Sequence, residues 1–322
     1  MYHINGFGIV KNNCKIITKP VNAMYFSEEV LTESALSRRT DRKEIICNYF
    51  RMRSFVNRHK WLLVRLCGVH RFMSEKLFIT DFDGVICDSV LECLLVTYNA
   101  YHGLTDDSFE RVLSLDAIPP EQQLRFRKLR PYLKGAEDFV PMYLAITAGA
   151  RIGNQDDFTA FRATHTEQLA TYQQAFYAER DYLQQHEKTI WLGMNPLFDG
   201  PKEALLACTS FERTYILTTK RQQDVQEIFE FQQIPFPIEH VIYMKAAGKL
   251  QKLLEMVREH DAAFDETIYV EDQIEFLTAS SQHNIGSYLV EWGYVSDQQL
   301  ALARRQGIPI ITPREFTRLL QG

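Results

Sequence analysis

Short apolar runs alternate with amphipathic stretches along most of the chain. A strand that is buried on both faces is apolar at nearly every position, so the runs predict strands of a parallel sheet. The stretches between them carry apolar residues every three or four positions, which is typical of helices packed on a sheet. The predicted strands lie at 76–80, 214–218, 237–243, 266–270, 287–290 and 308–311, and further helices at 222–232, 249–260, 274–281 and 297–306.

The order of these elements indicates a fold class. Strands that alternate with helices predict an α/β fold with a doubly wound parallel sheet. Between the first two strands, residues 105–190 carry helical patterns throughout, including a long helix over Asp156–Glu187. A helical insertion therefore interrupts the sheet-forming core. We place the insertion at 96–198 and the core at 73–95 and 199–322.

Charge divides the chain at Met73. Residues 1–72 hold 13 Lys and Arg against 5 Asp and Glu, whereas residues 73–322 hold 23 against 36. We expect residues 1–72 to be an N-terminal extension that is poorly ordered or not part of the main fold, with the working protein starting at Met73. An organelle-targeting segment and a small basic accessory region are the alternatives.

Composition argues against several classes of protein. The acidic bulk of the chain offers no general attraction to nucleic acid, and no apolar run reaches the roughly 18 residues of a membrane span. None of the six cysteines forms a Cys-x-x-Cys pair, which argues against a structural zinc site;. Sparse cysteines without a pattern suggest a reducing compartment. We therefore expect a cytoplasmic protein, with organelle targeting by residues 1–72 as the open alternative.

Two carboxylates follow the first predicted strand, in Asp81-Phe82-Asp83-Gly84-Val85. Side chains alternate along a strand, so Asp81 and Asp83 can face one side while Phe82 faces the core. Carboxylates this close repel each other unless a cation lies between them. One of them can attack phosphorus and form an aspartyl-phosphate, and the other can protonate the leaving oxygen and then deprotonate water. A calcium-type loop or a polar strand end is the alternative.

Polar groups also follow the second and fourth predicted strands. Thr218-Thr219 could bind a phosphoryl oxygen through a hydroxyl and backbone N–H groups, although threonine is also a common strand residue. Glu271-Asp272 suits a hard cation that prefers oxygen ligands, and an N-cap for the next helix is the alternative. In open α/β sheets function gathers at the carboxyl ends of the strands, so we expect these groups to converge with Asp81.

A lysine opens the helix after the third predicted strand. The helix dipole opposes a positive charge at its N-terminus, and a phosphate or a catalytic Asp would explain Lys249 at that position. Lys245 competes for the role, and a solvated lysine is the other possibility. Lys220, after the second strand, fits a solvated lysine at the start of the next helix.

The order of these motifs resembles the haloacid dehalogenase-like (HAD) hydrolase superfamily, with its phosphoglycolate phosphatase and β-phosphoglucomutase-like members. The resemblance covers about residues 75–320. It implies a HAD-like, Rossmannoid core and identifies the insertion as an α-helical cap that closes over the substrate. The matching positions are Asp81-Phe82-Asp83-Gly84-Val85, Thr218, Lys249, Glu271-Asp272 and Val290-Glu291-Trp292-Gly293-Tyr294.

The resemblance also implies a role for each matched residue. Asp81 would be the nucleophile and a Mg²⁺ ligand, and Asp83 the general acid/base that also binds the metal through its main-chain oxygen. Asp272 would complete the metal site, with Glu271 as a further ligand. The phosphate-binding residues would be Thr218 and Lys249, with Thr219 beside them. Many members carry another Asp four residues after the first metal Asp, where this chain has Phe276, preceded by Glu275.

Together, the motifs and the resemblance predict an Mg²⁺-dependent phosphatase that hydrolyses a small phosphate monoester through an aspartyl-phosphate. The expected partner is a small phosphorylated metabolite, with no nucleic acid and no membrane, and the oligomeric state is open. Carbon–halogen hydrolysis does not need the second carboxylate, so Asp83 argues against it. A phosphomutase stays open, as does a phosphonate hydrolase with Lys128 or Lys134 as a Schiff-base lysine. A non-catalytic phospholigand-binding module is the alternative from another class.

Substrate specificity is expected to come from the cap. Its cationic side chains are candidates for substrate contacts, but most are expected to be solvated surface charges. Tyr172, Phe176 and Tyr177 are expected to form the core of the cap. The cationic candidates are Arg125, Arg127, Lys128, Arg130, Lys134 and Arg151.

Overall fold

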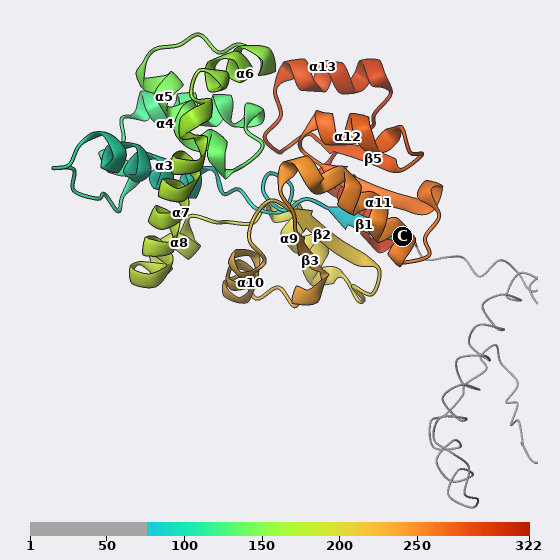
Figure 1. Ribbon diagram of the computed structural model, residues 1–322. Helices are drawn as coiled ribbons and strands as arrows, with labels where there is room; N and C mark the ends of the chain where they lie inside the picture. The colour runs from blue at the N-terminus through green and yellow to red at the C-terminus, as the bar shows by residue number, and fades with distance from the viewer. Residues whose placement is uncertain (1–75) are drawn as a thin grey trace, which may run out of the picture. The chain divides into compact units, whose positions relative to one another are not determined.

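Within residues 76–322, six parallel strands form one sheet (Figure 1). The structure is a computed structural model and describes these residues, so the extension predicted at 1–72 lies outside the described residues. The sheet confirms the predicted α/β class. In spatial order the strands are β3 (Val241–Tyr243), β2 (Thr214–Thr218), β1 (Leu77–Thr80), β4 (Thr267–Glu271), β5 (Gly286–Val290) and β6 (Ile310–Ile311).

Helices cover both faces of this sheet (Figure 1). They are α9 (Asp199–Ala207), α10 (Gln222–Phe231), α11 (Lys249–Glu259), α12 (Ile274–Ser281), α13 (Asp297–Gln306) and α14 (Pro313–Gln321). Leu77 and Ile79 of β1 belong to one hydrophobic cluster with Val257 of α11. Phe78, between them, instead meets Phe316 of α14 edge to face, with ring centroids 5.6 Å apart. Alternate residues of β1 thus reach opposite layers, which is why the whole run is apolar.

Between β1 and β2 the chain builds a helical insertion (Figure 1). Its helices are α3 (Val90–Thr105), which starts before the boundary expected at 96, α4 (Pro120–Leu129), α5 (Phe139–Thr147), α6 (Gln155–Ala163), α7 (Leu169–His186) and α8 (Lys188–Gly193). The rings of Phe139 and Phe176 stack with centroids 4.6 Å apart and join α5 to α7. No helix in residues 76–322 is long and apolar enough to cross a membrane.

The strand order reverses beside β1. From β1 the chain moves to β2 and then β3 on one side, whereas β4 lies on the other side of β1 and is followed outward by β5 and β6. In open α/β sheets, ligands bind in the crevice outside the carboxyl ends of the strands at such a reversal. The carboxyl ends of β1 and β4 are therefore the place where a site is expected.

Four predicted elements differ from the structure. The sixth strand, expected at 308–311, contributes only Ile310–Ile311. The strand expected at 237–243 contributes only Val241–Tyr243, because a 3-10 turn occupies Ile238–His240 after Pro237. The long helix expected over Asp156–Glu187 breaks between α6 and α7. At this break the hydroxyls of Thr164 and Thr166 donate to carbonyls three residues earlier, which competes with helical hydrogen bonding;. Residues 106–114 are also not helical, contrary to the helical pattern expected throughout 105–190.

Candidate active site

The loop after β1 brings two acidic residues to the strand reversal. The backbone N–H of Asp81 donates to the carbonyl of Val270 in β4, 2.9 Å away. Phe82 is fully buried and meets Phe229 of α10 edge to face, with ring centroids 5.4 Å apart. These two anchors fix the backbone that carries Asp81 and Asp83.

Two glycines let this loop close on Asp272. Gly84 has a φ of +87°, which residues with a side chain rarely adopt, and a Cβ there would lie 2.0 Å from Asp272 Oδ2;. A Cβ on Gly293 would lie 2.3 Å from the carbonyl oxygen of Gly84. The next residue, Tyr294, donates its backbone N–H to Asp272 Oδ2 at 3.1 Å. The segment after β5 therefore positions the Asp272 carboxylate.

Three carboxylates converge at this point. Asp81, Glu271 and Asp272 are buried, and each offers a ligand oxygen within 4.8 Å of the others. The structure thus brings together residues that lie almost 200 positions apart in the chain, as the sequence predicts. Burial and the charge of Asp81 raise the pKa of Asp272 to about 7 and hold that of Glu271 well above its usual range;.

Lys249 lies between two of these acids. Its Nζ is 3.1 Å from Asp81 Oδ2 and 2.9 Å from Glu271 Oε1. Burial opposes the charge of Lys249, but the two carboxylates outweigh burial and hold its pKa well above the usual range. The same ion pairs offset the unfavourable dipole at the start of α11. Lys245, the competing choice, is exposed.

The free oxygens of the cluster fit a divalent cation. Lys249 occupies one oxygen each of Asp81 and Glu271 and leaves Asp81 Oδ1 and Glu271 Oε2 buried without a hydrogen-bond partner. A buried polar atom without a partner is costly. Carboxylate oxygens are the ligands that Mg²⁺ prefers, so Asp81, Glu271 and Asp272 suit this ion.

Where the resemblance implies a further Asp, this chain has Phe276, and its ring and the neighbouring Glu275 contact lysines. The Phe276 ring lies 4.9 Å from Lys249 Nζ and so covers the buried ammonium. Its neighbour Glu275 lies 3.7 Å from Lys134 in the helical insertion. Among the described residues, neither side chain joins the group of acids that could hold a metal.

Asp83 pairs with a second lysine. Lys220 Nζ lies 3.2 Å from Asp83 Oδ1, and the lysine side chain is fully buried. Burial would raise the pKa of Asp83, but Lys220 and a hydrogen bond from Ser89 outweigh burial and lower it. The interpretation of Lys220 as a solvated helix start is therefore wrong.

The two threonines after β2 lie next to this pair. Thr218 is buried, and its Oγ1 accepts the backbone N–H of Lys220 at 3.1 Å, which positions the lysine. Because this oxygen accepts, the hydroxyl proton stays available to a ligand. Thr219 lines a cavity together with Asp83 and Lys220.

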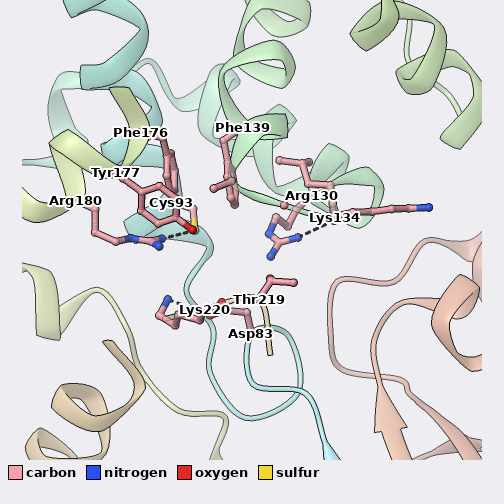
Figure 2. Close-up of a pocket in the computed structure, with 13 residues that line it drawn as sticks. Asp83, Cys93, Arg130, Lys134, Phe139, Phe176, Tyr177, Arg180, Thr219 and Lys220 are labelled. Carbon is pink, nitrogen blue, oxygen red and sulfur yellow. Dashed lines mark hydrogen bonds and ion pairs between the residues drawn. The ribbon is translucent and has the colours of Figure 1, made fainter. Parts of the chain in front are cut away.

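That cavity lies between Asp83 and the helical insertion (Figure 2). The core contributes Asp83, Thr219 and Lys220. The insertion contributes the opposite wall, with Cys93, Arg130, Leu133, Lys134, Gly135, Ala136, Phe139, Phe176, Tyr177 and Arg180. The insertion therefore covers the side of the site on which Asp83 lies.

Hydrogen bonds hold the helical insertion against the core. Gln273, next to Asp272, donates its amide to the carbonyl of Leu133 at 2.6 Å. Gln299 of α13 donates to the carbonyl of Pro131 at 3.2 Å. Both acceptors lie in the turn that follows α4, so this turn is fixed over the site from the core side.

Two buried arginines of the cavity wall depart from the sequence expectations. Arg130 was expected among the mostly solvated charges of the cap, but it is only 7% exposed. Arg180, which lies in the polar helix α7, was not singled out and is also buried. The sequence does carry a signal for the burial of Arg130, because the apolar residues Pro131-Tyr132-Leu133 follow it and are themselves buried. No comparable local signal marks Arg180.

Solved structures share this architecture. A HAD-like family hydrolase from Streptococcus pneumoniae is 16% identical, with a TM-score of 0.50 over 78% of this chain and 100% of that one. A candidate phosphoglycolate phosphatase from Lactobacillus delbrueckii subsp. bulgaricus is 14% identical, also with a TM-score of 0.50, 78% coverage of this chain and 100% of that one. No protein-family model and no curated protein matches the sequence. The sheet, its helical insertion and these likenesses show that the chain has the fold of the haloacid dehalogenase-like hydrolases.

Proposed function

We propose that this chain is an Mg²⁺-dependent phosphatase that hydrolyses a small phosphate monoester through an aspartyl-phosphate on Asp81. The observation that supports this most is the convergence of Asp81, Glu271 and Asp272 around free, buried oxygens at the strand reversal. The fold supports it further, because similar structures include a hydrolase and a candidate phosphatase.

In the first half-reaction, Asp81 would attack phosphorus, and the bond from phosphorus to the ester oxygen would break. Lys249, together with the hydroxyl of Thr218, would stabilise the phosphoryl oxygens. A Mg²⁺ ion on Asp81, Glu271 and Asp272, with the main-chain oxygen of Asp83, would offset the charge of the phosphate. The helical insertion would act as a cap that excludes water from the cavity.

Asp83 would move the protons. Lys220 lowers its pKa in the resting site, which suits the second half-reaction, where a carboxylate takes a proton from the water that attacks the aspartyl-phosphate. In the first half-reaction Asp83 must carry a proton to the leaving oxygen. A phosphate dianion beside Asp83 disfavours its ionised form, so substrate binding itself would promote that protonation.

The alternatives make different products. A phosphomutase would return an isomeric phosphate ester and little free phosphate. A phosphonate hydrolase would need a Schiff base, for which Lys134 lies on the cavity wall. Borohydride would trap such an adduct with a carbonyl-bearing phosphonate. A phospholigand-binding module would bind phosphate esters without turnover.

The test is phosphate release from a panel of phosphate monoesters by the full chain, with Mg²⁺ or with EDTA. Asp81→Asn should lose activity by about a thousandfold or more while keeping its fold. Asp265→Asn, an exposed residue after α11, is the matched control and should behave as wild type. Turnover that survives in EDTA or in Asp81→Asn would overturn the proposal.

A further inference from the structure

The helical insertion covers a space that is too small for a substrate. The cavity between Asp83 and the insertion measures about 30 Å³, which holds roughly two or three waters. Even a small phosphate ester is larger than this, so the insertion must lift from the core for a substrate to enter. The contacts that return the insertion to the core therefore decide when the site is complete.

Two linkers join the insertion to the core, and they pair with each other. The backbone N–H of Phe198 donates to the carbonyl of Ile86 at 2.9 Å, and that of Asp88 donates to the carbonyl of Pro196 at 2.8 Å. An antiparallel bridge lies between these two bonds. Because both linkers run through this pair, any movement of the insertion must bend the chain there. We call residues 86–88 and 196–198 the hinge.

Asp88 is the hinge side chain at which the core and the insertion meet. The hydroxyl of Tyr294, from the core, donates to Asp88 Oδ1 at 3.0 Å. Arg127 of α4, from the insertion, donates to Asp88 Oδ2 through two nitrogens at 3.2 Å. The pair of Arg127 and Asp88 is partly exposed, so water can replace either partner when the contact breaks;. This contact is therefore one that can form and break repeatedly.

The other end of Tyr294 reaches the carboxylate cluster. Its backbone N–H donates to Asp272 Oδ2 at 3.1 Å. Its ring is buried, with the centroid 4.4 Å from the guanidinium of Arg130 at the end of α4. Two residues earlier, Trp292 donates its indole N–H to the carbonyl of Val85 at 3.0 Å, which ties the segment to the loop after β1. One residue thus contacts the cluster with its backbone and the hinge with its side chain.

We propose that Tyr294 is a positioning residue that couples cation binding at Asp272 to docking of the helical insertion. This rests on the proposed function, which makes Asp272 a metal ligand. When a cation holds Asp272, the backbone of Tyr294 is held with it, and its hydroxyl keeps Asp88 where Arg127 binds. Without a cation, repulsion among the three acids shifts the carboxylate and loosens the same contacts. The insertion is then docked firmly only when the site is loaded.

The test is amide hydrogen exchange of the full chain in EDTA and in saturating Mg²⁺, without substrate. In wild type, Mg²⁺ should slow exchange about 10-fold in peptides that cover α4 and the turn after it, which is a typical coupling between two sites. Peptides from the loop after β1 should slow as well. Tyr294→Phe removes only the hydroxyl, so it should abolish the effect on α4 and keep the effect on the loop. Arg127→Gln should give the same pattern.

Tyr143→Phe is the matched control, because it removes a hydroxyl that bonds to Gln122 inside the insertion and should leave the wild-type response intact. The double variant of Tyr294→Phe and Arg127→Gln should lose no more than either single variant, since both break one series of contacts. The proposal is overturned if α4 of wild type does not respond to Mg²⁺, if Tyr294→Phe responds as wild type does, or if the two losses add. Arg127 is partly exposed, so its variant decides the question even if Tyr294→Phe does not fold.

The exchange measurement needs no turnover, which separates this proposal from the phosphatase function. If Mg²⁺ slows exchange in α4 through Tyr294 but no phosphate ester is hydrolysed, the phosphatase function fails and the coupling stands. If esters are hydrolysed with Mg²⁺ but α4 of wild type does not respond to the ion, only the coupling fails. Calorimetry adds a second readout. Because coupling is reciprocal, Tyr294→Phe should weaken Mg²⁺ binding by no more than about 10-fold, and a larger loss would mean that Tyr294 builds the metal site itself.

Discussion

Replacing Asp272 by Asn tests the carboxylate cluster through stability. In the metal-free protein, burial and the neighbouring Asp81 raise the pKa of Asp272 from 3.8 to about 7. An acid with a higher pKa in the folded state costs no stability below its unfolded pKa. The cost grows between about pH 4 and 7 and is complete above that range. At about 1.4 kcal/mol for each pH unit, the ionised carboxylate costs the folded protein at most about 4–5 kcal/mol.

Asparagine removes this cost because it cannot ionise, and it still offers an oxygen to the backbone N–H of Tyr294. In EDTA at about pH 8, we expect Asp272→Asn to be more stable than wild type by about 1–3 kcal/mol, with little difference at about pH 4. Millimolar Mg²⁺ should erase this advantage. An ion that binds only the folded state raises the free energy of unfolding by about 2.7 kcal/mol at a concentration of about 100 times Kd. The variant lacks one of the metal ligands, so it should gain less than wild type.

Urea denaturation at both pH values, with EDTA or Mg²⁺, measures these differences. Asp265→Asn removes an exposed carboxylate and serves as the control for net charge. If Asp272→Asn is the less stable protein in EDTA above pH 7, the three acids do not repel one another as described. If Mg²⁺ stabilises the variant as much as wild type, Asp272 is not a ligand.

Two further substitutions test how the site is built. Gly84→Ala should destabilise the protein by about 2–4 kcal/mol and weaken the stabilisation by Mg²⁺, because its Cβ would collide with Asp272;. Gly149→Ala also has a positive φ but faces open space, and should cost only about 1–2 kcal/mol by the same urea assay; equal losses would show that the collision is relieved. Glu92→Ala should cost about 3–5 kcal/mol in calorimetric unfolding, because it leaves the buried Arg180 without its closest carboxylate;. A loss below about 1 kcal/mol would mean that water replaces the carboxylate.

The central part of the fold follows from the sequence because β1, β2 and β4 are buried on both faces and read as apolar runs;. The edge strand β3 is harder to bound, since only Val241 of its three residues is buried. Helix α14 was not predicted, although Thr312 and Glu315 form a reciprocal capping box that is visible in the sequence;.

The acidic half of the site was predictable for a different reason. Asp81, Glu271 and Asp272 each follow a recognisable strand, and parallel strands bring their carboxyl ends to one edge. Lys220 and Arg180 were not predictable in the same way, because their burial depends on how the helical insertion packs on the core. A charged residue in a polar segment looks solvated until its tertiary partner is known, and Asp83, the partner of Lys220, lies 137 residues away.

Trapping the covalent intermediate tests the central claim most directly. The full chain is mixed with Mg²⁺ and a phosphate monoester that it hydrolyses, turnover is stopped with acid, and peptides are analysed by mass spectrometry. The proposed mechanism predicts a phosphoryl group on Asp81 that is absent before substrate is added and absent in Asp81→Asn. Phosphate release without any phosphorylated peptide, or with the phosphoryl group on another residue, would contradict it.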